Sequence, residues 1–163
     1  MSWETTRRAA LLGGLGTLAA PALVGAQQAR TLRLNHTDTE VGARQEAALL
    51  FARRVQELTD GRFRVQVLHS GQLANDARSL EQVAVGSIDM AITGVVTYAT
   101  HTRPLNLIAL PYLAETYQQG WRLYDDSRFI ADQKTALISR GMRIIGDWEA
   151  GFRSFSTTFP LPS

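Results

Sequence analysis

The sequence predicts an α/β fold built around a mostly parallel sheet, and three consecutive segments carry that prediction. Residues 62–68 alternate polar and apolar side chains, which is typical of a strand with one buried face. Residues 77–84 place apolar side chains at helical spacing, and residues 88–92 form a nearly continuous apolar run, as in a strand buried on both faces. A strand, a helix and a second strand in this order form a βαβ unit, whose two strands run parallel.

Turn and cap residues mark the ends of the helix in this unit. Gly71 interrupts the chain after the first strand, Asn75 is of a type that caps helix N-termini, and Gly86 stands where a C-terminal cap glycine is expected. We therefore predict a helix that begins after Asn75 and ends before Gly86.

Two preceding elements extend the unit to a βαβαβ order. Residues 32–34 predict a short strand, and residues 40–58 predict a helix that the Thr59-Asp60-Gly61 sequence ends. In open parallel sheets, ligands bind outside the carboxyl ends of the strands. The candidate loops are therefore residues 35–39, 69–73 and 93–98.

The second half of the chain is less regular. Residues 105–110 are apolar and are interrupted by Pro111-Tyr112. Residues 116–124 and 129–140 predict helices, the second ended by Gly141, and residues 142–146 predict a further apolar strand.

The first 26 residues are interpreted as an export signal. Arg7 and Arg8 precede an apolar stretch, and Val24-Gly25-Ala26 resembles a signal-peptidase site. The arginine pair partly matches a twin-arginine signal, and ordinary secretion remains the alternative. An uncleaved anchor is disfavoured, because a membrane span needs roughly 20 apolar residues. Either export route predicts a periplasmic protein cleaved near Ala26.

Composition excludes several functional classes. The absence of cysteine rules out disulfides, thiolate metal sites and a cysteine nucleophile. The net charge of +2 gives no electrostatic case for nucleic acid as a partner. No histidine stands in a metal-binding spacing, so we predict no metal site, and the absence of a Gly-x-Ser-x-Gly motif counts against an esterase.

Six short segments together resemble the solute-binding proteins of tripartite ATP-independent periplasmic (TRAP) transporters, of the dicarboxylate-binding type. The similarity runs from about residue 32 to residue 160, and it depends on the order and spacing of the segments. They are Phe51-Ala52-Arg53-Arg54-Val55, Thr59-Asp60-Gly61-Arg62, Gly71-Gln72-Leu73, Gly86-Ser87-Ile88-Asp89-Met90-Ala91, Leu110-Pro111-Tyr112-Leu113 and Gly151-Phe152-Arg153.

The resemblance implies a periplasmic-binding-protein-like lobe. Family members have two lobes that close around a small organic acid and deliver it to the permease subunits in the membrane; they are not enzymes and need no organic cofactor. Members have roughly twice the mature length of this chain, so it is interpreted as an N-terminal fragment with most of the second lobe missing. Residues 27–150 would form the first lobe, and residues 151–163 would begin the crossover into the second.

The resemblance also implies ligand contacts. By its position in the Gly-Phe-Arg segment, Arg153 would meet the ligand carboxylate, which a guanidinium fits with two parallel donors. The alternative is a surface arginine beside an aromatic strand. Thr37 and His36 lie in the first strand-end loop, where the alternative is a solvated loop in which Asp38 or Thr39 caps the next helix.

Three further residues complete the candidate set. Gly94 and Val95 follow the third strand, where Gly94 would leave room for a ligand or serve a tight turn. Glu149 could line the pocket beside Trp148, although Trp148 would otherwise belong to the core. Three other functions remain open: a periplasmic sensor domain of a signalling receptor, an exported α/β enzyme such as an esterase, and a truncated remnant without function.

Overall fold

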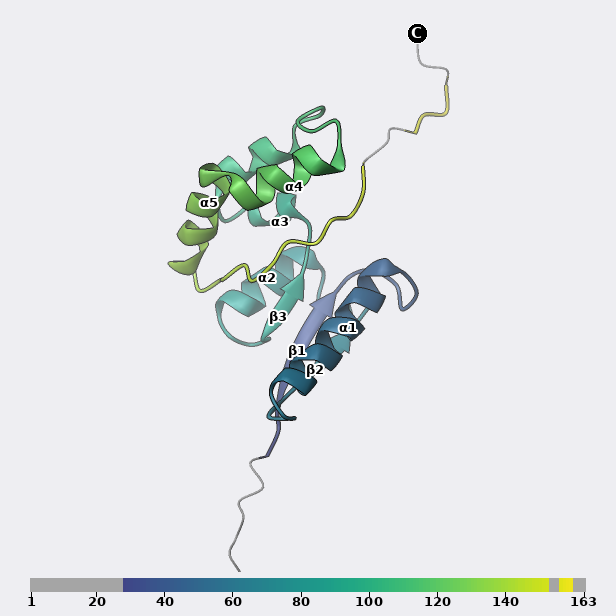
Figure 1. The fold of residues 1–163 in the computed structure, drawn as a ribbon, viewed down its shortest axis with the longest axis vertical. Helices are drawn as coiled ribbons and strands as arrows, with labels where there is room; N and C mark the ends of the chain where they lie inside the picture. The colour runs from purple at the N-terminus through teal and green to yellow at the C-terminus, as the bar shows by residue number, and fades with distance from the viewer. Residues whose placement is uncertain (1–27, 153–155, 160–163) are drawn as a thin grey trace, which may run out of the picture.

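The computed structural model describes residues 28–152 and 156–159 of the chain (Figure 1). Strands and helices alternate at first, and helices follow. The elements are β1 (Arg30–His36), α1 (Ala43–Leu58), β2 (Phe63–Leu68), α2 (Asp76–Ala84), β3 (Met90–Ile92), α3 (Val95–Tyr98), the 3-10 helix η1 (Arg103–Ala109), α4 (Tyr117–Asp126) and α5 (Arg128–Ile138).

The described strands form a three-stranded parallel sheet in the order β2-β1-β3. Strand β1 is central: Arg30 pairs with Phe63 at one end, and His36 pairs with Ile92 at the other. Helix α1 packs against β2, and α2 packs against β3. The predicted α/β class, the βαβαβ order and the parallel sheet are therefore confirmed.

The strand limits differ from the prediction in two places. Strand β1 extends to His36, so Asn35 and His36 close the central strand instead of beginning a polar loop. Strand β3 has three residues, all half-buried, so the prediction of a longer strand buried on both faces was wrong. In the described sheet β3 is an edge strand that pairs only with β1, which limits its length and burial.

Both predicted caps of α2 are confirmed. The Asn75 side chain accepts a hydrogen bond from the Arg78 amide at 2.9 Å. Gly86 has φ 74°, and the amides of Gly86 and Ser87 donate to the carbonyls of Val83 and Gln82 at 3.0 and 2.8 Å. This pair of bonds is the Schellman motif, which needs a residue in the left-handed conformation after the helix.

Helix α1 begins three residues later than predicted. Gly42 precedes it with φ 140°, a backbone conformation that cannot continue a helix. Its end is as predicted, because Asp60 and Gly61 both have positive φ and the Gly61 amide donates to the Gln56 carbonyl at 2.8 Å.

Both later helices are confirmed, and the later strand is not. Thr116 and Gln119 form a capping box at the start of α4, and Gly141 follows α5 with φ 77°. The apolar residues 105–110 contribute to η1. The strand predicted at residues 142–146 was wrong: residues 142–152 have no regular structure, and we call them the strap. No described strand pairs with the strap; side chains hold it instead.

One buried cluster joins α2, α3, η1, α5 and the first residue of the strap. Its members are Leu80, Ala99, Leu105, Ile130, Leu137 and Met142. Figure 1 shows the strap leaving α5 and passing between the α3–α5 helices and the sheet. Within the described ranges no helix is long and apolar enough to cross a membrane. The export signal predicted at residues 1–26 lies outside those ranges.

Candidate ligand site at the carboxyl ends of the strands

The loops that follow the strands meet at one edge of the sheet, because all three strands are parallel. Two backbone hydrogen bonds join the first two loops: the Gly71 amide donates to the His36 carbonyl at 2.9 Å, and the Ser70 amide donates to the Asp38 carbonyl at 2.7 Å. The loop after β2 is thus fixed against the loop after β1.

Asn35 organises this edge from below. It is 1% exposed, and its side-chain oxygen accepts from the Leu73 amide at 3.3 Å. Its side-chain nitrogen donates to the Ala74 carbonyl at 2.9 Å and to the Ser79 hydroxyl at 2.8 Å. Sequence analysis did not identify Asn35. A polar side chain closing an otherwise buried strand was the available signal, because such a group is buried only with hydrogen-bond partners.

Thr37 lies at the top of the edge and is oriented by a carboxylate. Its hydroxyl donates to Asp76 Oδ1 at 2.8 Å. Asp76 is the first residue of α2, where a negative charge is favourable near the helix N-terminus. Asp76 was also missed, because its proximity to Thr37 depends on the loop after β2.

His36 is fully buried beneath this pair. Its Nε2 lies 2.8 Å from Oε1 of Gln45, which is itself buried in α1. The amide oxygen can only accept, so Nε2 carries the proton in this arrangement. His36 has no exposed surface for a ligand, and it connects β1 to α1.

The expected capping of α1 by Asp38 or Thr39 is not seen. Asp38 forms an ion pair with Arg44 at 2.8 Å, and the Thr39 hydroxyl donates to the Val41 carbonyl at 2.8 Å. Gly42 occupies the N-cap position without a side-chain bond.

The third loop has open space at Gly94. A Cβ atom there would meet no atom within 4 Å, and its φ of −70° is accessible to any residue. The turn therefore does not require glycine. Val95 begins α3 and packs against the buried cluster, so most of its surface faces the interior.

The strap adds Trp148 and Glu149 to the region. Trp148 is 44% exposed and meets Phe51 of α1 edge-on, with ring centroids 6.5 Å apart, so it belongs to the rim of the fold and not to the core. The Glu149 carboxylate is exposed and accepts a hydrogen bond from the Gly151 amide. Arg153 lies outside the described residues.

The carboxylates of Asp147 and Asp76 affect two tyrosines near this edge. Burial, and then the charges of Asp147 and Asp76, raise the pKa of Tyr98 to about 12. Burial and the charge of Asp147 also raise the pKa of Tyr124. Both hydroxyls are therefore neutral at pH 7, and Asp147 of the strap lies near α3 and α4.

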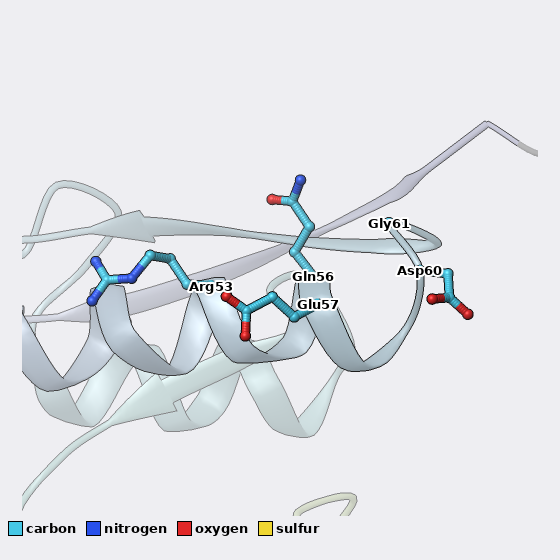
Figure 2. Close-up of a pocket in the computed structure, with 5 residues that line it drawn as sticks. All are labelled: Arg53, Gln56, Glu57, Asp60 and Gly61. Carbon is cyan, nitrogen blue, oxygen red and sulfur yellow. The ribbon is translucent and has the colours of Figure 1, made fainter.

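One surface hollow lies away from this edge and does not have the features of a ligand site. Figure 2 shows it at the end of α1, on the side of the amino ends of the strands, where the side chains point in different directions. Its lining consists of Arg53, Gln56, Glu57, Asp60 and Gly61. Converging polar groups are expected of a ligand site, and this hollow does not provide them. The described residues also contain no cluster of three or more side chains suited to a metal ion.

The parallel βαβαβ sheet with polar loops at one edge matches part of a periplasmic-binding-protein lobe in solved structures. The family model of bacterial extracellular solute-binding proteins, family 7, matches residues 34–163. The chain belongs to this family, as the resemblance predicted.

Relatives and solved structures agree with that assignment. The chain is 23% identical to the 2,3-diketo-L-gulonate-binding periplasmic protein of Escherichia coli over 97% of this chain and 47% of that protein. A TRAP periplasmic solute-binding protein of Roseobacter denitrificans with bound L-galactonate has TM-score 0.63 and 26% identity, over 68% of this chain and 36% of that one.

A TRAP periplasmic solute-binding protein of Sulfitobacter with bound β-D-galacturonate has TM-score 0.69 and 23% identity, over 75% of this chain and 40% of that one. The chain thus spans less than half the length of each of these proteins.

Proposed function

We propose that the chain is part of the solute-binding component of a TRAP-type secondary transporter, which captures a small organic acid in the periplasm and delivers it to a membrane permease. The family match carries this proposal. The names and bound ligands of its relatives, which include sugar acids, support a carboxylate as the ligand class.

The ligand would bind at the carboxyl edge of the sheet. Thr37 offers a hydroxyl held in place by Asp76, and Gly94 leaves space for the ligand to approach the backbone. Glu149 would stand at the strap side, Arg153 would bind the carboxylate, and His36 with Val95 would support the edge from within.

The energetics require more than one anchor. A charge-assisted hydrogen bond contributes about 1.5–3 kcal/mol, whereas micromolar binding needs about 8 kcal/mol. Arg153 alone therefore cannot account for tight binding. Contacts from the rest of a complete binding protein would supply the remainder, as the length of the relatives suggests.

Thermal unfolding with and without candidate acids tests the proposal. L-galactonate, D-galacturonate and succinate would each be titrated, and a ligand at about 100 times its dissociation constant should stabilise the protein by about 2.7 kcal/mol. Arg153→Met should reduce the stabilisation by about 1.5 kcal/mol or more, and Arg143→Met, an exposed arginine of the strap, is the matched control. If no carboxylate stabilises the wild-type protein, the proposed function is wrong.

A further inference from the structure

The strap is held where it is by side chains that reach three different helices. Met142 enters the buried cluster at its start, and Phe152 lies against Tyr117 of α4 at its end, with ring centroids 4.8 Å apart. Between them, Trp148 meets Phe51 of α1. The strap therefore connects α1 to α4, which make no direct contact of note with each other.

Asp147 lies at the middle of this arrangement. Its carboxylate forms an ion pair with Lys134 of α5. The two side chains are 28% and 29% exposed, so water screens them less than it screens the pair Arg54–Glu57, whose side chains are 64% and 59% exposed. Partial burial makes the loss of one partner more costly, because the other charge is then left without compensation.

Groups from three helices face Asp147. Lys134 of α5 forms the ion pair, and the carboxylate charge of Asp147 adds to burial in raising the pKa of Tyr98 of α3 and of Tyr124 of α4. The strap that carries Asp147 passes between the helices and the sheet, as Figure 1 shows.

We propose that Asp147 and Lys134 are positioning residues for the ligand site: their ion pair fixes the strap beside the carboxyl ends of the strands, so that Trp148 and Glu149 wall the bound acid. Neither residue needs to touch the ligand. The inference rests on the proposed function, because it assumes that an organic acid occupies this edge.

Cross-relaxation in NMR spectra between the ring protons of Trp148 and Phe51 measures the attachment of the strap without any ligand. In Lys134→Met this ring contact should be lost, while the contacts between β1 and β2 stay unchanged. The exchange of charges, Lys134→Asp with Asp147→Lys, should restore the ring contact. Arg54→Met removes the more exposed pair and is the matched control. An unchanged ring contact in Lys134→Met would overturn the proposal.

Titration with L-galactonate then tests the effect on the site. Lys134→Met should raise the dissociation constant about tenfold, and the double charge exchange should recover most of the affinity. Loss of the ring contact with unchanged affinity would overturn the positioning role. If the wild-type chain binds none of the tested acids, the proposed function fails and the positioning role fails with it, whereas the ring contact still decides whether the pair anchors the strap.

Discussion

The loop after β2 and the strap border the same edge of the sheet, but they are held in different ways. Backbone hydrogen bonds and the buried Asn35 fix the loop to β1. The strap depends on one buried methionine, one ion pair and two aromatic contacts. We therefore expect that loosening the loop would disrupt the sheet, whereas a shift of the strap would leave the sheet intact. The difference suggests a rigid wall and an adjustable wall around one site.

The largest expected effect comes from opening the buried cluster into which the strap inserts Met142. Leu80 is 2% exposed in the cluster that also holds Met142 of the strap. Leu80→Ala should lower the free energy of unfolding by about 2–5 kcal/mol, because it leaves a cavity. Urea unfolding measures this. Leu58→Ala, at a side chain that is 78% exposed, should stay within about 0.5 kcal/mol of the wild type.

Two glycines allow the packing at the start of the strap to be compared with the packing at the end of α2. Gly141 and Gly86 have φ 77° and 74°, so alanine at either should cost about 1–2 kcal/mol. A Cβ at Gly141 would lie 2.4 Å from the Ala84 carbonyl oxygen, whereas a Cβ at Gly86 meets nothing within 4 Å. Gly141→Ala should therefore cost about 1–3 kcal/mol more than Gly86→Ala in urea unfolding. Equal costs would contradict the close approach of Gly141 to the end of α2.

The loop side of the comparison is tested at Asn75. Asn75→Ala removes the cap of α2 and should cost about 1 kcal/mol, measured by chemical unfolding. The NMR contact between the rings of Trp148 and Phe51 should stay unchanged at the same time. A weaker ring contact would show that the two walls are coupled. Asn75→Ser, which restores a capping side chain, should recover most of the loss.

Alkaline pH tests the strap side through Tyr98. The folded protein keeps the Tyr98 proton up to about pH 12, and the unfolded chain releases it near pH 10. The contribution of Tyr98 to the free energy of unfolding is therefore fully present below pH 10 and is lost as the pH rises toward 12. Between pH 9 and pH 11 the wild type should lose about 1 kcal/mol more than Tyr98→Phe in urea unfolding. Tyr112→Phe, at an 89% exposed ring, should behave as the wild type.

The regular part of the fold was predictable because local patterns determine it. Alternation gave β2, helical spacing gave α1 and α2, and Asn75 with Gly86 gave the limits of α2. The strap was not predictable in the same way. Residues 142–146 have the composition of a strand, but a strand also needs a partner with free backbone groups, which composition does not report.

The edge where the strand-end loops meet was predictable from the sequence, but the contacts around it were not. The carboxyl-edge rule selected the loops that contain Thr37 and Gly94, and the family resemblance selected Thr37 within its loop. It could not show that His36 is sealed beneath the edge by Gln45, nor that Asp76 holds Thr37. The Thr37–Asp76 contact joins residues far apart in the sequence, and the His36–Gln45 contact is buried by packing. Only the folded structure reveals such contacts.

The central position of β1 has a consequence for how the sheet assembles. The strand is the first element of the described fold, yet its partners begin 33 residues later at Phe63 and 56 residues later at Met90, counted from Arg30 and Leu34. Helix α1 can form locally, but no sheet pairing exists until long stretches of chain have been brought together. Such non-local pairing slows folding relative to helical proteins. A nascent chain that ends before residue 63 therefore carries its central strand with both edges open.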